Sequence, residues 1–316
     1  MIETETLIVG GGPAGSTCAW QLQQRHADFL LLEKERFPRF KPCAGWVTPV
    51  VLRDVQLDPG VYPGGLTHFD SFELWIKDIH IRLPVKQFAI RRVEFDDWLL
   101  SRVRERVVQH SVTRIERVND GFVVDGEYRC RYLVGAGGTY CPVRRAFAGG
   151  DRFGEPGTLI AALEEEFAYD HADPRCHLWF FQHELPGYAW YVPKVNGVVN
   201  VGIGAGAAAL KTKEMSLKNH WQRLVEQLDQ SGLVRGHAHK PAGHTYHLRG
   251  RPPQEVPPGV FLVGDALGLA TRDMGEGIGP AVRSGLNAAR AILDGSQYRL
   301  TGIGRYSFPS LLGLKK

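Results

Sequence analysis

Residues 10–15 of the chain read Gly10-Gly11-Gly12-Pro13-Ala14-Gly15, and this stretch decides the fold. Thr6–Val9 precedes it as a short apolar run, Ala14–Arg25 follows with a helical composition, and Phe29–Leu32 is a second apolar run. A strand, a glycine turn, a helix and a second strand in this order form a βαβ unit, whose two strands pair in parallel. The sequence therefore predicts an α/β sheet at the N-terminal end of the chain.

The glycine turn fits the G-x-G-x-x-G pattern of dinucleotide-binding sites, and it has the strand before it and the helix after it that such sites require. Gly10 allows the tight turn, Gly12 lets the backbone approach a pyrophosphate, and Gly15 lets the helix pack on the strand. The helix N-terminus then presents free N–H groups to the phosphates. Glu33, at the end of the second strand, is suited to accept hydrogen bonds from a ribose diol. The residues predicted to bind the dinucleotide in this unit are Gly10, Gly12, Pro13, Ala14, Gly15, Glu33 and Lys34.

The composition is that of an ordinary globular protein, with 43% hydrophobic and 23% charged residues. The net charge is only +4, and basic and aromatic residues do not alternate as in proteins that bind single-stranded nucleic acid, so we expect no nucleic-acid partner. Five cysteines without a CxxC pair argue against a disulfide framework and against a cysteine zinc site. The chain starts without a signal-peptide pattern and has no apolar stretch of about 18 residues, which predicts a cytoplasmic protein.

The middle of the chain changes character in two segments. Residues 68–92 and 158–206 are rich in short apolar runs with polar breaks, which is typical of antiparallel strands. Helices are predicted at Glu94–Gln109, Lys213–Leu228 and Glu276–Leu293. The fold class is therefore α/β, with a Rossmann-like cofactor-binding domain into which an antiparallel β-sheet substrate domain (α+β) is inserted. The predicted ranges are 1–66, 93–155 and 250–300 for the cofactor-binding domain, 67–92 and 156–249 for the substrate domain, and 301–316 for a C-terminal tail.

The last third of the chain contains a second set of cofactor-site signals. Val260–Val263 is a buried strand that ends in Gly264-Asp265, and Gly275-Glu276-Gly277-Ile278-Gly279 opens a helix. Over residues 1 to roughly 295 the sequence resembles the geranylgeranyl reductase family of FAD-dependent oxidoreductases, which have the aromatic-hydroxylase type of fold. Besides GGGPAG and Glu33, the resemblance is carried by KPCAGW (41–46), RRVEFD (91–96), LVGAGG (133–138), PGYAWYVP (186–193), VGDALG (263–268) and GEGIGPAVRSG (275–285).

The resemblance implies FAD as the cofactor and adds to the predicted cofactor site. The residue that matches Asp265 binds the ribitol chain in the wider superfamily, and the backbone that matches Gly277 and Ile278 meets the N1–C2=O edge of the flavin. A helix N-terminus there stabilises the negative charge of the reduced flavin. Arg92 is expected near the dinucleotide. The further cofactor-binding residues are Ala44, Gly45, Arg92, Gly264, Asp265, Gly277 and Ile278.

Three residues are predicted to be catalytic: Cys43, Tyr188 and Trp190. Pro186–Pro193 resembles the reductase motif P-x-Y-x-W-x-F-P with Val192 in place of Phe, and strand alternation puts Tyr188, Trp190 and Val192 on one face. This face either lines a slot for an apolar substrate or is a core face without a ligand. Cys43 lies where family members often have P-C-G-G, next to the isoalloxazine. It either acts at the flavin, as a proton donor or by shaping the flavin face, or is a small buried filler.

The predicted activity is reduction of C=C bonds of an isoprenoid or similar apolar substrate by hydride transfer from reduced flavin. The electron donor is either reduced nicotinamide or a ferredoxin-like protein. Two alternatives stay open: an FAD-dependent monooxygenase or halogenase of the same fold, and a non-catalytic electron-relay flavoprotein. Gly137 argues against the first alternative, because hydroxylases usually carry Asp at this position, where it helps to hold cofactors including the nicotinamide donor.

Three weaker patterns complete the analysis. Gly202–Gly206 follows a strand and is interpreted as the end of that strand rather than as a second nucleotide site. No metal site is predicted, although His237, His239, His244 and His247 lie close together in the sequence. The tail at Arg305–Lys316 mixes apolar and basic residues, and it either makes a peripheral contact with the inner face of the membrane or packs on the domain.

Overall fold

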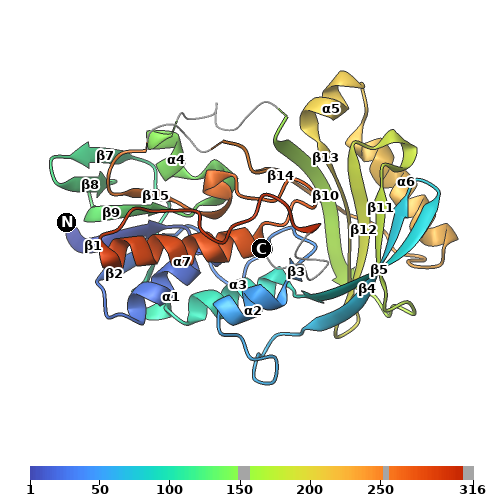
Figure 1. The fold of residues 1–316 in the computed structure, drawn as a ribbon, viewed down its shortest axis with the longest axis horizontal. Coiled ribbons are helices and arrows are strands. Elements are labelled where there is room, and N and C mark those ends of the chain that lie inside the picture. The colour runs from blue at the N-terminus through green and yellow to red at the C-terminus, as the bar shows by residue number, and fades with distance from the viewer. Residues whose placement is uncertain (149–156, 252–255, 309–316) are drawn as a thin grey trace.

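The computed structural model describes residues 1–148, 157–251 and 256–308 of the chain. Figure 1 shows two β-sheets that lie end to end along the long axis of the molecule. The first sheet carries long helices along its length, and the second sheet has its helices near its outer end. The prediction of a Rossmann-like α/β part joined to a second, strand-rich part is confirmed. The residue boundaries assigned to the two domains stay a prediction.

The first sheet is built around the βαβ unit that the glycine turn predicts. Its strands are β1 (Ile2–Val9), β2 (Phe29–Glu33), β6 (Val107–Gln109), β7 (Ile115–Val118), β8 (Gly121–Val124), β9 (Tyr128–Gly135) and β15 (Val260–Leu262). They lie in the order β6-β2-β1-β9-β8-β7, with β15 paired to β9. Strands β6, β2, β1, β9 and β15 pair with their neighbours in parallel. Strands β7, β8 and β9 form an antiparallel meander.

Helices cover both faces of the first sheet because the residues of β1 alternate between two apolar clusters. Ile8 packs under α1 (Pro13–Gln23) and α7 (Ile278–Asp294), whereas Leu7 and Val9 pack on the side of α4 (Pro142–Phe147). The two long helices touch directly, since a Cβ on Gly285 of α7 would overlap the carbonyl oxygen of Ala14. This contact fixes the start of α1 against α7. The remaining helices of this part are α2 (Pro49–Asp54), α3 (Arg92–Ser101) and the 3-10 turns η1 (Arg104–Arg106), η2 (Gly138–Tyr140) and η5 (Gly264–Leu267).

The second sheet is mostly antiparallel, as predicted, but one of its strand pairs is not. Its strands are β3 (Trp46–Val47), β4 (Thr67–Ile76), β5 (Ile79–Ala89), β10 (Leu159–Ala168), β11 (Cys176–Phe180), β12 (Gly187–Lys194), β13 (Val198–Gly206) and β14 (Ala242–His247). They follow the order β14-β10-β13-β12-β11-β4-β5-β3, in which β11 and β4 are parallel. Its outer face packs on α6 (Leu217–Gln230), beside α5 (Ala207–Thr212) and the turn η4 (Gln182–Glu184).

Two local predictions are wrong. The helix predicted at Glu94–Gln109 ends at Ser101, and residues 107–109 form β6, because they pair with Leu31–Glu33 of β2. The glycines of Gly202–Gly206 do not follow a strand but lie inside β13, which continues its pairing with β10 as far as Gly206.

The structure bears only in part on the predicted membrane contact. Within the described ranges, no helix combines the length and the apolar character needed to cross a bilayer. Residues 305–308 fold back on the segment before α7, where the backbone N–H groups of Ser307 and Phe308 donate to the carboxylate of Asp273. The rest of the tail, residues 309–316, lies outside the described residues.

Candidate functional site

A cavity of about 1220 Å³ joins the glycine turn of the first sheet to the inner face of the second sheet. It is larger than the roughly 1,000 Å³ that bounds ordinary small-molecule sites. The predicted site residues along its wall are Gly10, Gly12, Pro13, Ala14, Glu33, Lys34, Cys43, Ala44, Gly45, Arg92, Tyr188, Trp190, Gly264, Asp265, Gly277 and Ile278. Gly15 is absent from the wall because it faces inward, where a Cβ would overlap the carbonyl oxygen of Gly10.

The N-terminus of α1 forms one end of the cavity. The helix begins directly after Gly12, and no side chain caps it or adds a negative charge to its first turn. Its N-terminal N–H groups and partial positive charge are therefore directed at the cavity, as at a phosphate site. Glu33 lies beside this turn and is 6% exposed; it accepts hydrogen bonds from the backbone N–H groups of Gly11 at 2.5 Å and Glu35 at 2.8 Å.

Two arginines that line the cavity, Arg92 and Arg39, meet at the carboxylate of Asp96. Arg92 makes two hydrogen bonds of 2.7 Å to the buried carboxylate of Asp96. Burial lowers the pKa of Arg92, but Asp96 and then Cys43 raise it, and the net shift is upward. Arg39, which the sequence analysis missed, lies 3.4 Å from the same carboxylate and 3.6 Å from the position that a Cβ on Gly12 would take. Arg39 is therefore a cation next to the predicted pyrophosphate position, and no sequence pattern indicates that its loop returns to Gly12.

A second helix N-terminus, that of α7, also lies on the wall of the cavity. Gly277 immediately precedes α7, and no side chain caps this helix. Asp265 lies next to it, with Oδ1 at 3.5 Å from the position of a Cβ on Gly277. The backbone N–H of Gly264 donates to Ser284 of α7 at 2.9 Å, which ties the turn η5 to the helix. The two motifs VGDALG and GEGIG are thus brought together, as expected.

Aromatic side chains of the second sheet form the opposite wall. Trp190 is 5% exposed, and its indole Nε1 donates to Asn200 Oδ1 at 2.7 Å. The hydroxyl of Tyr188 donates to the carbonyl of Met274 at 2.6 Å, which ties the sheet to the segment before α7. Trp46 stacks on Tyr188 and meets Trp190 edge-on. The surface of this wall at Tyr188, Trp190 and Trp46 is aromatic, and Asn200 of the same sheet donates to the carbonyl of Cys43 at 3.4 Å.

The comparisons with known proteins agree with this geometry. Residues 8–60 match the NAD(P)-binding Rossmann-like domain family. An uncharacterized protein of Methanosarcina barkeri is 30% identical over 303 residues, which are 92% of this chain and 75% of that protein. Digeranylgeranylglycerophospholipid reductase 2 of Methanosphaera stadtmanae is 27% identical over 327 residues, which are 93% of this chain and 80% of the relative.

The chain belongs to the geranylgeranyl reductase family of FAD-dependent oxidoreductases. Among solved structures, a geranylgeranyl bacteriochlorophyll reductase-like protein of Thermoplasma acidophilum shares the fold with a TM-score of 0.76 and 21% identity, over 93% of this chain and 79% of that one. A flavin-dependent brominase also shares the fold, with a TM-score of 0.71 and 17% identity, over 96% of this chain and 81% of that one. Fold alone therefore does not choose the reaction of this family member.

The sequence analysis also missed polar residues in the aromatic wall of this reductase-family cavity. Glu164 on β10 and His244 and Tyr246 on β14 line it. Burial lowers the pKa of His244 to about 4, assisted by the positive charges of Lys41 and Arg92, so that His244 is neutral near pH 7. Strand alternation separates Glu164 from Leu163 and Phe167, which pack in the cluster under α6, but it does not tell which face of the sheet lines the cavity.

Two of the clustered histidines lie on that opposite face, away from the cavity. His237 Nε2 and His239 Nδ1 lie 3.1 and 3.0 Å from the two carboxylate oxygens of Glu165. The sequence analysis found no carboxylate near these histidines, because Glu165 is far from them along the chain. The three ligand atoms lie within 4.8 Å of one another, a spacing that a metal ion also accepts. The expectation of no metal therefore stays a prediction.

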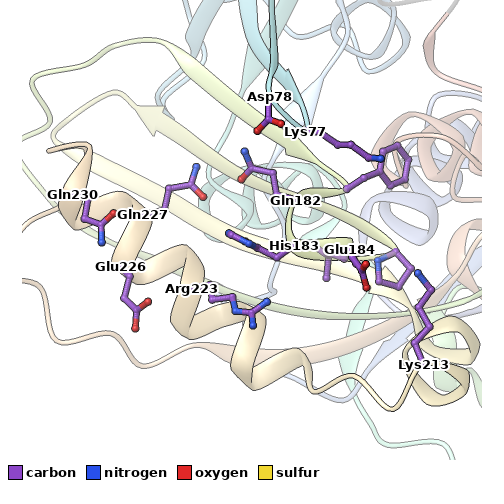
Figure 2. Close-up of a pocket in the computed structure, with 13 residues that line it drawn as sticks. Lys77, Asp78, Gln182, His183, Glu184, Lys213, Arg223, Glu226, Gln227 and Gln230 are labelled. Carbon is purple, nitrogen blue, oxygen red and sulfur yellow. The ribbon is translucent and has the colours of Figure 1, made fainter.

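A second hollow, of about 1160 Å³, contains none of the predicted site residues. Figure 2 shows Arg223, Glu226 and Gln227 on α6 beside His183 and Glu184 of the neighbouring turn. Its labelled side chains are polar or charged and of both signs, which does not suit an apolar substrate.

Proposed function

We propose that this family member binds FAD without a covalent bond and reduces C=C bonds of an isoprenoid or similar apolar molecule. The observation that carries the proposal is that one continuous cavity runs from the glycine turn and Glu33 to the aromatic wall of Tyr188 and Trp190. Its residues fit FAD: two uncapped helix N-termini suit the pyrophosphate and the flavin N1 edge, and Glu33 suits the ribose diol. Reduced FAD, when bound, supplies the hydride.

The residues of the chain would orient the two reactants and exclude water. The backbone at Gly12 and the cation of Arg39 would hold the pyrophosphate, while Asp265 would hold the ribitol and Gly277 and Ile278 the flavin edge. Tyr188, Trp190 and Trp46 would press the substrate chain against the flavin, since their contact surface in the cavity is aromatic. Cys43 stays a candidate for proton transfer or for shaping the flavin face.

Gly137 supports reduction over a monooxygenase or halogenase activity. A Cβ at this position would lie 3.1 Å from the Cα of Cys141 and 3.2 Å from Cδ of Pro142. These distances leave little room for the aspartate that hydroxylases usually carry here. We therefore propose that the electron donor does not dock in the hydroxylase manner, with reduced nicotinamide and a ferredoxin-like protein both retained as donors. The cytoplasmic location also stays a prediction.

The test is an anaerobic single-turnover experiment on FAD-reconstituted protein. Heat release from the protein as purified, before any FAD is added, followed by chromatography should give FAD. An apolar polyprenyl alkene should reoxidise the chemically reduced holoenzyme and gain two hydrogens, as mass spectrometry would show. Recovery of a nicotinamide dinucleotide alone would contradict the cofactor assignment. Reoxidation by oxygen with hydroxylated or halogenated product, and none by alkenes, would favour the monooxygenase or halogenase. Rapid exchange of electrons with acceptor proteins, with no alkene product, would indicate an electron relay.

Glu33→Gln is expected to weaken FAD binding about ten- to hundredfold. The carboxylate accepts charge-assisted hydrogen bonds, each worth about 1.5–3 kcal/mol, and the amide keeps the shape but not the charge. Isothermal titration of the apoprotein with FAD measures the loss, and the redox potential of the bound flavin should stay unchanged. Unaltered FAD affinity would show that Glu33 does not meet the ribose.

A further inference from the structure

Glu164 is a buried acid in the aromatic wall of the cavity. It lies in the middle of β10, directly opposite Gly202 of β13 and Ala242 of β14, and Gly202 is in turn opposite Trp190 of β12. Neighbours in register share one face of a sheet, so Glu164 lies on the same face as Trp190. It lines the cavity and is 1% exposed. Its Oε1 has no hydrogen-bond partner among the residues that the structure describes.

The cation nearest to Glu164 is engaged elsewhere, whereas two neighbouring groups hydrogen-bond to its carboxylate. Lys194 Nζ donates to Glu166 Oε2 at 2.6 Å and to the carbonyl of Ile90 at 2.9 Å. Asn200 accepts from Trp190 and donates to the carbonyl of Cys43, and its side chain and the Cys43 backbone also hydrogen-bond to the Glu164 carboxylate, which leaves Oε1 as the oxygen without a partner among the described residues. Burial raises the pKa of Glu164 to about 7, and the opposing effects of Lys194, Asn200 and the Cys43 backbone do not cancel it. The titratable or charged groups that face Glu164 are Lys194 on β12, Lys41 and Cys43 in the loop, and Tyr246 on β14.

The other acids of the cavity are less suited to donate a proton. The hydroxyl of Tyr188 already donates to Met274, and Cys43 Sγ accepts from the backbone N–H of Gly45 at 3.4 Å. Burial raises the pKa of Glu276, which also lines the cavity, to about 7 as well, but its side chain hydrogen-bonds to Ser307 and its Oε1 lies 2.5 Å from the position of a Cβ on Gly279. Glu164 therefore combines an acidic group, an oxygen with no hydrogen-bond partner among the described residues and a place on the wall of the cavity.

We propose that Glu164 is the acid that donates a proton to the substrate when its double bond is reduced. This proposal rests on the proposed function, in which reduced FAD supplies the hydride. As the hydride adds to one alkene carbon, the O–H bond of Glu164 breaks and its proton forms the new C–H bond at the other carbon. The π electron pair of the alkene becomes that bond, and the carboxylate left behind regains a proton from water. A carboxyl group that is still protonated near neutral pH suits this step.

The experiment compares wild-type holoenzyme with Glu164→Gln, Glu164→Asp and the control Glu165→Gln. Glu165 is the next residue along β10, and its side chain lies on the opposite face with His237 and His239. Glu164→Gln is expected to slow alkene-dependent reoxidation by about 10²–10⁴ and to leave FAD affinity nearly unchanged. Glu164→Asp should retain part of the rate, and Glu165→Gln should react as the wild type does.

The pH dependence and an infrared measurement complete the test. The donor must be protonated, so the wild-type rate should be high below about pH 7 and fall above it, and Glu164→Gln should lose this dependence. Infrared difference spectra of protein without substrate should show a protonated carboxyl band that fades over the same pH range and is missing from Glu164→Gln. The band tests the state of Glu164 independently of activity.

Three results would overturn the inference while leaving the proposed function intact. They are a wild-type rate in Glu164→Gln, a Glu164 that is already ionised well below neutral pH, and loss of the pH dependence in Cys43→Ser instead of Glu164→Gln. If Glu164→Gln does not fold, the infrared titration and Glu164→Asp decide in its place. Failure of every alkene to reoxidise the wild type is a different result, and it overturns the proposed function itself.

Discussion

Gly12→Ala is expected to abolish FAD binding without unfolding the protein, whereas Gly15→Ala is expected to destabilise the fold itself. A Cβ on Gly12 would have only Arg39 Nη2 near it, at 3.6 Å, so the protein has room for the methyl group. The same methyl group would project to where the pyrophosphate must approach the backbone. Overpacking of this kind costs about 3 kcal/mol, which corresponds to a loss of affinity of more than about hundredfold.

Gly15, unlike Gly12, has no room for a Cβ. Its Cβ would overlap the carbonyl oxygen of Gly10, which is backbone and cannot turn aside as a side chain can. The helix α1 would have to move away from the turn, at a cost of about 3 kcal/mol or more. Since a protein of this size loses about 2–4 °C of Tm per kcal/mol, the apoprotein should melt several degrees lower.

Thermal unfolding of the two apoproteins, together with titration by FAD, separates the two roles. Gly12→Ala should melt with the wild type and should not stay yellow once the unbound FAD has been removed by gel filtration. Normal FAD affinity in Gly12→Ala would show that the pyrophosphate does not approach this turn. A wild-type Tm in Gly15→Ala would show that the helix start is less rigid than its contacts indicate.

These contrasts also show what the sequence could predict. The βαβ unit is local: strand, turn, helix and strand follow one another, and the glycine pattern has one geometric meaning, so the parallel core of the first sheet could be predicted from it. The end of α3 was predicted wrongly for the opposite reason. Val103 and Val107 continue the helical periodicity of the preceding residues, but residues 107–109 pair with β2. Tertiary pairing thus outweighs local pattern there.

The polar residues of the aromatic wall mark the limit of prediction from the sequence. Glu164, Glu165 and Glu166 are consecutive, yet the first lines the cavity, the second binds two histidines, and the third pairs with Lys194. Alternation separates Glu165 from the other two. It does not tell which face of the sheet meets the cofactor, because that depends on how the two sheets pack. Arg39 was missed because no sequence pattern indicates that its loop returns to Gly12.

The glycines of β13 illustrate the same limit and lead to a second prediction. Gly202 and Gly204 were interpreted as the end of a strand, because no acidic residue ends a following strand at the distance that a second nucleotide site needs. The structure gives them another role: a Cβ on Gly202 would overlap Cζ2 of the Trp190 ring. A glycine is therefore needed at position 202, because the indole of Trp190 on the neighbouring strand lies over it. The local sequence pattern does not indicate this contact between strands.

Gly202→Ala is expected to reduce alkene-dependent turnover by about hundredfold and to leave FAD affinity nearly unchanged. The added methyl group would push the indole of Trp190 by about 1 Å, break its 2.7 Å hydrogen bond to Asn200 and also displace Glu164, whose Cβ would lie 2.8 Å away; a misplacement of this size can cost about 10² in rate. Gly204→Ala is the matched control, because its Cβ would have its nearest neighbours, on Ile160 and Trp190, at 3.7 Å, which is ordinary contact. Neither glycine lines the cavity itself.

Nitrogen-labelled tryptophan makes this experiment independent of activity. The indole N–H resonance of Trp190, assigned with Trp190→Phe, should shift in Gly202→Ala and stay in place in Gly204→Ala. A shift together with lost turnover and retained FAD would support a wall that positions the substrate. If Gly202→Ala instead loses FAD or unfolds, the wall is a core face whose aromatic residues hold the two sheets together. If the resonance shifts and turnover stays at the wild-type rate, the position of Trp190 does not govern the reaction, and the substrate must lie against the flavin by other contacts, of which those of Tyr188 and Trp46 are nearest.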